Sequence, residues 1–203
     1  EFNEVEIINQ LASYSEKARK EGLLSLESVI EENPNPMIRK GLMFVVDGIE
    51  PQVVRDILDR ESFLHEQEYS AGAEIFEAAG GYSPTMGIVG TVMGLISVLS
   101  SLDDPSHLGE AIAVAFVATL YGVAFANLMW LPFANKIKVK AKKEVMVNDL
   151  IIEGLLAIQA GENPKIIKEK LNLSLIEKLS GAKKESGEET ETEGEEKVRS
   201  EEV

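Results

Sequence analysis

Two uncharged stretches joined by a short acidic link constrain this chain more than any other feature. They run from Pro84 to Leu102 and from Ala111 to Ala134, and neither contains Asp, Glu, Lys, Arg or His. A helix needs roughly 20 residues, at about 1.5 Å each, to cross a hydrocarbon layer of about 30 Å. Both stretches reach that length, which predicts a transmembrane hairpin at residues 81–135. A buried hairpin of a soluble protein is the less favoured alternative.

The charges beside these stretches predict the topology. Lys residues recur between positions 136 and 143, whereas the link at 103–110 has no Lys or Arg. Positive charge gathers on the cytoplasmic side of a membrane protein. We therefore expect residues 1–80 and 136–182 in the cytoplasm, the link outside, and the lipid bilayer around the hairpin.

The cytoplasmic parts predict helices and no strands, so the fold class is all-α. Apolar residues recur with a period near 3.6 from Glu4 to Lys20, and turn residues interrupt the pattern afterwards. From Pro51 a helix with Val53, Val54, Ile57, Leu58 and Leu64 on one side is expected to run to about Ala79 and to end at Gly80-Gly81. Further helices are expected at Leu23–Glu31, Met37–Val46, Lys136–Gln159 and Leu171–Leu179.

Composition excludes several functions. The net charge is −15, and residues 183–203 are so rich in Glu and so poor in apolar side chains that we expect a disordered acidic tail. There is no Cys, hence no disulfide and no thiolate metal site. Phosphate loops, nucleophile elbows and basic nucleic-acid footprints are also absent from the sequence. We predict neither an enzyme nor a nucleic-acid-binding protein, and no metal or cofactor.

Small residues line one face of each span, where they allow close helix packing within lipid. These residues are Gly87, Gly90 and Gly94 in the first span, and Ala115 and Gly122 in the second. Thr91 and Thr119 lie mid-span on the same faces. A Thr hydroxyl can coordinate a cation or hold a water molecule, although it often bonds its own helix carbonyl four residues back.

An ion path through these spans needs a group that they lack. A transmembrane proton path normally uses an ionisable side chain, and neither span has one. If ions pass along the small face, the carboxylate must come from a missing segment or from a partner subunit.

The span ends carry prolines and aromatic residues. Pro84 opens the first span, where a proline costs little, and Pro132 is expected to kink or hinge the second span as it leaves the membrane. Tyr82, Trp130 and Phe133 suit anchors at the membrane interface.

At these residues the chain resembles the MotA family of flagellar motor stator subunits, over almost all of residues 10–140. The motifs that carry the resemblance are Pro84–Thr91, Leu99–Pro105, Ala115–Gly122 with Pro132 beyond it, Ala18–Glu27 and Gly41–Gly48.

The resemblance implies a complex in the bacterial cytoplasmic membrane. Each subunit would have four membrane helices, of which this chain holds the last two. Five such subunits would surround two copies of MotB, whose single span supplies the Asp that takes up H+ or Na+. The transported ion would be the only small species involved.

The resemblance also implies roles for individual residues. Thr91 and Thr119 match positions that line the ion path near the partner's carboxylate. Pro84 and Pro132 match prolines linked to the coupling of ion flow to movement. Arg19 and Glu27 match positions that contact the rotor switch protein FliG, although an Arg and a Glu on a solvated helix are ordinary surface.

Two other functions stay open. One is an ExbB- or TolQ-like proton-channel subunit that energises an outer-membrane process, and such subunits usually have one helix before the cytoplasmic region. The other is a passive membrane scaffold, in which Thr91 and Thr119 serve packing alone.

Overall fold

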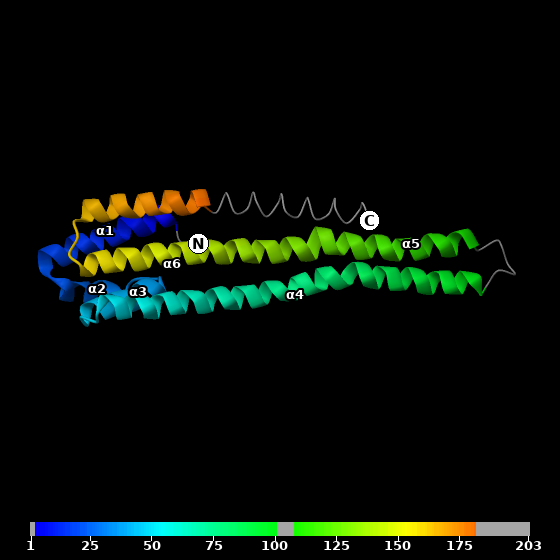
Figure 1. Ribbon diagram of the computed structural model, residues 1–203, viewed down its shortest axis with the longest axis horizontal. Coiled ribbons are helices and arrows are strands. Elements are labelled where there is room, and N and C mark those ends of the chain that lie inside the picture. The colour runs from blue at the N-terminus through cyan, green and yellow to red at the C-terminus, as the bar shows by residue number, and fades with distance from the viewer. Residues whose placement is uncertain (1–2, 101–107, 182–203) are drawn as a thin grey trace. The chain divides into compact units, whose positions relative to one another are not determined.

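A computed structural model describes residues 3–100 and 108–181, and within these ranges it contains helices and no strands (Figure 1). The predicted all-α class is confirmed. The chain divides into two compact units. Unit 1 comprises the chain up to Phe63 and from Glu144 onward, and unit 2 is Leu64–Lys143. Most of the predicted outer link, residues 103–107, and the acidic tail at 183–203 lie outside the described residues.

Unit 1 begins with helices whose ends follow local chemistry. The side chain of Asn3 accepts a hydrogen bond from the Val5 N–H at 3.1 Å and so caps α1 (Glu4–Glu21). Gly22, with a φ of 87°, ends that helix in a conformation that other residues rarely adopt. The turn η1 (Leu23–Leu26) and the short α2 (Glu27–Ile30) follow.

A short non-helical segment that includes Asn33 and Asn35 leads into α3 (Pro36–Val46). The Asn35 side chain caps this helix by accepting from the N–H groups of Met37 and Ile38, at 2.9 and 3.3 Å. A last helix covers residues 164–181 and is longer than the stretch that the sequence predicts.

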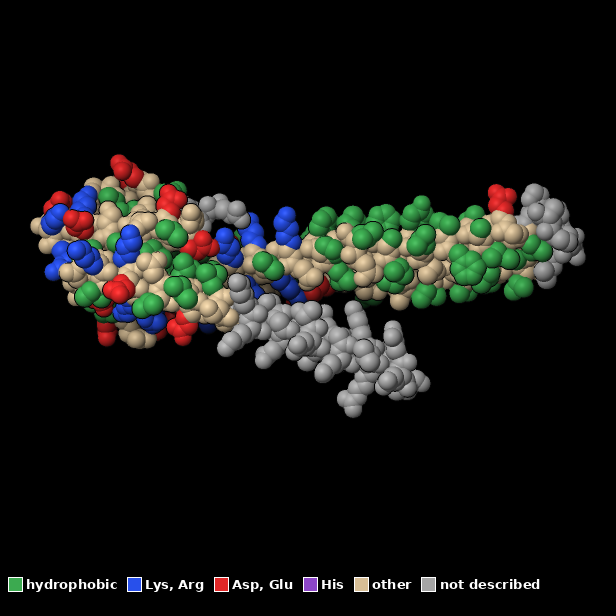
Figure 2. Space-filling model, turned by 90° about the horizontal axis from the view of Figure 1, so that it is seen from above, with side chains coloured by type: hydrophobic (Ala, Val, Ile, Leu, Met, Phe, Trp, Pro, Cys, Tyr) green, Lys and Arg blue, Asp and Glu red, His purple; other side chains and the backbone are tan. Residues whose placement is uncertain are grey.

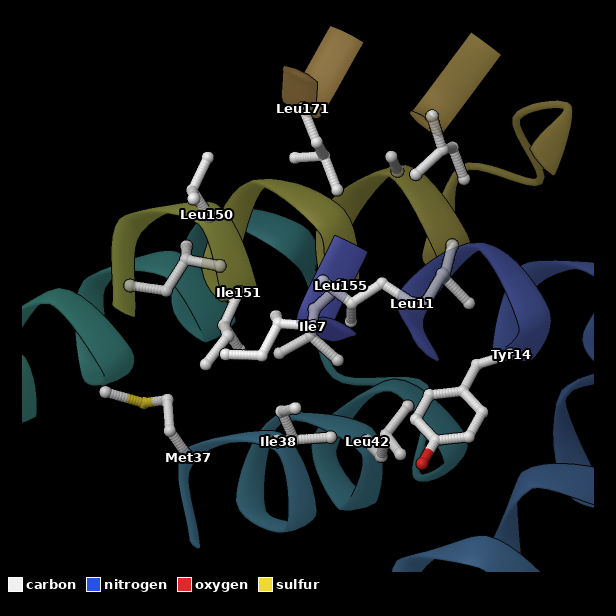
Figure 3. Close-up of a cluster of buried hydrophobic side chains, with 14 of the residues drawn as sticks. Ile7, Leu11, Tyr14, Met37, Ile38, Leu42, Leu150, Ile151, Leu155 and Leu171 are labelled. Atoms are coloured by element: carbon white, nitrogen blue, oxygen red, sulfur yellow. The ribbon is translucent and has the colours of Figure 1, made fainter. Parts of the chain in front are cut away.

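The core of unit 1 joins segments that are far apart in the sequence. Leu11 of α1, Leu42 of α3 and Leu155 of α6 (Leu131–Gln159) are 0% exposed and lie together with side chains of the last helix (Figure 3). Burial of such side chains removes apolar area from water and is the main term that holds the unit together.

Some residues on the predicted apolar side of the helix after Pro51 are buried, whereas others are exposed. Val54 and Leu58 are 0% exposed in the core of unit 1, as expected. Val53, Ile57 and Leu64, however, are 42%, 37% and 52% exposed, so only part of this apolar side enters the core. Their angular positions fall beside the core-facing strip rather than on it.

Unit 2 contains parts of α4 (Pro51–Leu99), and the expected helix end at Gly80-Gly81 is wrong. The helix passes through both glycines and through Pro84 without interruption. A Cβ on Gly80 would lie 2.8 Å from Leu131 Cδ2, so this glycine permits close packing instead of ending a helix. A continuous helix also keeps backbone groups bonded, which a hydrocarbon environment requires.

The second long helical run has three parts. They are α5 (Leu108–Phe125), the π-helical turn η3 (Ala126–Trp130) and α6 (Leu131–Gln159). In η3 the N–H of Leu131 donates to the carbonyl of Ala126, five residues back. Pro132 has no N–H, and the altered bonding comes directly before it. Pro132 therefore lies inside a continuous helical run that carries one irregular turn.

Both runs are long and apolar enough to cross a membrane. Large apolar side chains cover the outside of unit 2, and Figure 2 shows them gathered along it. Met86, Leu120 and Leu128 are examples, 69%, 64% and 80% exposed. Water does not favour such a surface, whereas lipid does.

We predict that Gly41→Ala destabilises unit 1. The added Cβ would overlap Leu155 Cδ1 and lie 3.2 Å from Leu58 Cδ1. Overpacking of this kind lowers the free energy of unfolding by about 1–3 kcal/mol. The measurement is the thermal unfolding midpoint of the detergent-solubilised chain, followed by circular dichroism.

Gly72→Ala is the matched control, because a Cβ at helical Gly72 meets no atom within 4 Å. It should leave the midpoint unchanged or raise it, since Ala favours a helix interior by up to about 1 kcal/mol over Gly. Equal midpoints for the Gly41 variant and the unmodified chain would contradict the packing at Gly41.

Candidate functional site

The backbones of α4 and α5 touch in the middle of the hairpin. A Cβ on Gly122 would lie 2.7 Å from the Ser83 carbonyl oxygen and 3.0 Å from Gly87 Cα. A Cβ on Gly87 would lie 2.9 Å from the Ala118 carbonyl oxygen. Since backbone cannot move aside as a side chain can, only glycine fits at both positions.

The close contact continues along the predicted small faces. A Cβ on Gly90 would lie 3.1 Å from Ala118 Cβ, and one on Gly94 would lie 2.7 Å from Ala115 Cβ. Ala115 is itself 2% exposed. The structure thus brings together all five residues for which the sequence predicts helix packing.

This approach places the two Thr hydroxyls in one hydrogen-bonded cluster. Thr91 Oγ1 lies 2.7 Å from the Ala115 carbonyl oxygen across the interface and 3.2 Å from the Gly87 carbonyl oxygen of its own helix. Thr119 Oγ1 lies 3.3 Å from the same Gly87 oxygen. The Thr91 and Thr119 hydroxyls also form a hydrogen bond with each other.

The cluster offers more contacts than it has protons. Each hydroxyl carries one proton and two lone pairs. Four contacts therefore share two donors, and the bonding pattern can change without movement of either backbone. The local bond from Thr91 to Gly87, expected as an alternative to an ion site, is present together with the bonds between helices.

The bonds between helices could not be predicted from the sequence. They form only if a suitable residue of α5 lies opposite Thr91. The spacing of residues within one helix does not determine how that helix aligns with its neighbour. The sequence feature that points to such bonds is the presence of one Thr at the centre of each small face. Among the residues that the structure describes, no acidic or basic side chain bonds either hydroxyl, and the two spans contain none.

Both prolines lie on the same side of this cluster along the hairpin, Pro84 before Thr91 in α4 and Pro132 after Thr119 in the second run. Ser83 and Gly87 face Gly122, whereas Gly80 faces Trp130 and Leu131. Residues 80–87 of α4 therefore lie beside residues 122–131, a range that contains η3. Pro84 is half-buried within that part of α4, and Pro132 is exposed one residue beyond it.

Arg19 and Glu27 belong to unit 1, and both are exposed. Neighbouring charges are already bound: Lys17 Nζ donates to Ser28 Oγ at 2.7 Å, and Lys20 pairs with Glu16 at 2.6 Å. The latter hydrogen bond lowers the pKa of Glu16 and raises the pKa of Lys20. Within the described ranges, Arg19 and Glu27 form no ion pair.

A family model described as the MotA/TolQ/ExbB proton channel family matches residues 29–150. The chain belongs to this family. It is 44% identical over 170 residues to Motility protein A of Bacillus subtilis, a match that covers 84% of this chain and 63% of that protein. The chain thus spans less than two thirds of this relative's length.

Two solved structures resemble the fold. The match to the C. jejuni MotAB structure has a TM-score of 0.82 at 33% identity and covers 85% of this chain and 68% of that one. The match to the flagellar MotAB stator complex from Bacillus subtilis has a TM-score of 0.77 at 44% identity and covers 82% and 65%. The predicted family is confirmed, while the roles assigned to single residues stay predictions.

We predict that Gly122→Ala pushes the two hairpin helices apart. The added Cβ meets the Ser83 carbonyl oxygen at 2.7 Å, and the separation should grow by about 1–2 Å, since packed helices vary over roughly 8–10 Å with the side chains at the contact. The chain has no Cys, so Met93→Cys and Val114→Cys supply unique sites for spin labels on exposed positions. The distance between the labels is measured by pulsed electron paramagnetic resonance.

Gly81→Ala serves as the control, because a Cβ there meets no atom within 4 Å. Its distance distribution should match that of the unmodified hairpin. An unchanged distribution for the Gly122 variant would show that the helices do not touch at this point.

Proposed function

We propose that this chain is a flagellar motor stator subunit that couples transmembrane flow of H+ or Na+ to torque on the rotor. The observation that carries the proposal is the Thr91–Thr119 hydroxyl cluster, held between two glycine-packed spans, Pro84–Leu102 and Ala111–Ala134, that contain no carboxylate. The similarity to Motility protein A and to MotAB stator complexes supports this function over an ExbB- or TolQ-like role.

The ion path requires a second subunit. A MotB-like partner would supply the Asp that takes up the ion, and the hydroxyl cluster would lie beside it. When a partly dehydrated cation or a protonated water arrives, the Thr oxygens can offer lone pairs while their protons remain donated to the Ala115 and Gly87 carbonyls. The ion is then cargo, and no resident metal or cofactor takes part.

Force transfer would use unit 1. Arg19 and Glu27 are exposed charges without ion-pair partners among the described residues, so they are available to oppositely charged groups on FliG. Pro84 and Pro132 would link ion-dependent changes in the hairpin to movement of the cytoplasmic part. We further infer a bacterial cytoplasmic membrane location and a pentameric ring of such subunits around MotB.

We predict that Thr91→Val and Thr119→Val each lower ion flux through the complex with the MotB-like partner. Valine keeps the volume near constant but removes the hydroxyl, and the loss of a hydrogen-bonding group of this kind corresponds to about tenfold. Flux is measured in vesicles with a pH-sensitive dye for H+ or a Na+-sensitive dye for Na+.

Thr91→Ser and Thr119→Ser are the matched controls, because they keep the hydroxyl. They should retain most of the flux. A passive scaffold would give the same flux in the Val variants as in the unmodified complex, and that result would remove the ion-path roles.

We predict that combined charge reversal, Arg19→Glu with Glu27→Lys, abolishes swimming without changing ion flux. The complete gene that encodes this chain is introduced, with its partner, into cells that lack their own stator, and swimming speed is recorded. Reversal places like charges against the rotor, and juxtaposed like charges at an interface disfavour binding strongly.

Arg39→Glu with Glu50→Lys is the control, because both residues are exposed charges of the same unit. Cells with these changes should swim normally. Normal swimming of the Arg19 and Glu27 variant would refute the rotor contact, and failure of the unmodified gene to restore swimming would refute the stator function itself.

A further inference from the structure

An aromatic cluster ties α4 to the second helical run within unit 2. The rings of Phe76 and Trp130 have centroids 6.3 Å apart, and those of Phe76 and Phe133 lie 5.9 Å apart in an edge-to-face arrangement at 89°. Offset and edge-to-face pairs at such separations are attractive beyond simple burial. Phe76 thus lies against residues on both sides of Leu131.

An ion pair and a tight contact join the same two helices beside the rings. Lys138 Nζ donates to Glu77 Oε1 at 2.6 Å. Gly80 lies so close to Leu131 that a Cβ would come within 2.8 Å of its Cδ2 atom. These contacts bracket one short region, and we name the set Phe76, Glu77, Trp130, Phe133 and Lys138 the clasp.

The clasp adjoins the least regular part of both helices. Pro84 cannot donate a hydrogen bond to the Gly80 carbonyl, and on the other side η3 and Pro132 interrupt the regular α-helical bonding. Missing backbone bonds make these turns the easiest places for either helix to bend. Without contacts between the helices, each could bend independently of the other.

We propose that the clasp makes the two helices move as one lever during force transfer. Bending at Pro84 and at η3 is then shared, because the clasp joins residues 76–77 of α4 to residues 130–138 of the second helical run, next to both irregular turns. The ion pair between Glu77 and Lys138 sets the orientation of the two helices, and the three aromatic rings supply the contact area. The residues of the clasp are positioning residues, since they act through the helices and touch no ion. This inference rests on the function proposed above.

The chain itself provides the test, because it has no cysteine and Gly80 is well placed for a cross-link. A Cβ on Gly80 would lie 3.6 Å from Trp130 Cβ, within the range of roughly 3.5–4.5 Å that a disulfide needs. The double variant Gly80→Cys with Trp130→Cys removes an aromatic ring when reduced and restores the link covalently when oxidised with diamide.

The variant is introduced with its partner into stator-deficient cells, and torque on tethered beads is recorded beside ion flux in vesicles. In the reduced form we expect torque to fall by about twofold or more, the range typical of residues that carry coupling, with flux retained. Oxidation should restore the torque. The single variants Gly80→Cys and Trp130→Cys cannot form this link and should not respond to diamide.

A second pair of variants covers the case in which the cysteine variant does not assemble. Glu77→Lys and Lys138→Glu should each lower torque, and the combined swap should restore it, because the opposite charges then face each other again. Tyr82→Ala removes an exposed aromatic side chain outside the clasp and should leave the ratio of torque to flux unchanged.

The outcomes separate this inference from the proposed function. Loss of torque on oxidation would mean that the helices must part here, and full torque in the reduced form would mean that the clasp has no role. Either result overturns the lever while leaving the stator function in place. If the unmodified complex neither conducts ions nor produces torque, the proposed function fails first.

Discussion

The contact between the backbones at Gly87 and Gly122 is the constraint on which the rest of the hairpin depends. A side chain at either position would meet backbone atoms at 2.7–2.9 Å, so the contact exists only because both residues are glycine. The approach in turn brings the Thr91 hydroxyl within 2.7 Å of a carbonyl on the facing helix. In lipid, where apolar contact alone does not favour helix association, such packing and bonding hold two helices together.

Much of the hairpin could be predicted from the sequence because its determinants are local. Apolar length predicts the spans, and the spacing of small residues predicts the packing face. The helix end expected at Gly80-Gly81 is absent, because those glycines serve packing against Leu131. That role cannot be seen in one helix alone, because it depends on which residue of the facing helix lies beside Gly80.

In unit 1, too, the sequence of one helix does not show which charged side chains have partners in the fold. The sequence places Lys17, Arg19 and Lys20 on one helix, where Glu16 four residues before Lys20 favours an ion pair with it. It does not distinguish Lys17 from Arg19. In the structure Lys17 donates to the Ser28 hydroxyl and Lys20 pairs with Glu16, whereas Arg19 has neither a side-chain hydrogen bond nor an ion pair in the described part of the chain. The availability of Arg19 for an external partner is therefore a tertiary property.

The hydroxyl cluster also explains how two spans without Asp, Glu, Lys, Arg or His can respond to an ion. Two protons are shared among four contacts, and the Gly87 carbonyl accepts from both Thr side chains at 3.2 and 3.3 Å. A charge that arrives beside the cluster favours one pattern over another, because a cation needs lone pairs and an anion needs donors. When the hydrogen-bonding pattern changes, Thr91 bonds either the Gly87 carbonyl of its own helix or the Ala115 carbonyl of the facing helix. Gly87 lies three residues beyond Pro84, so an alteration at the cluster acts on the part of α4 where the backbone already lacks a hydrogen bond.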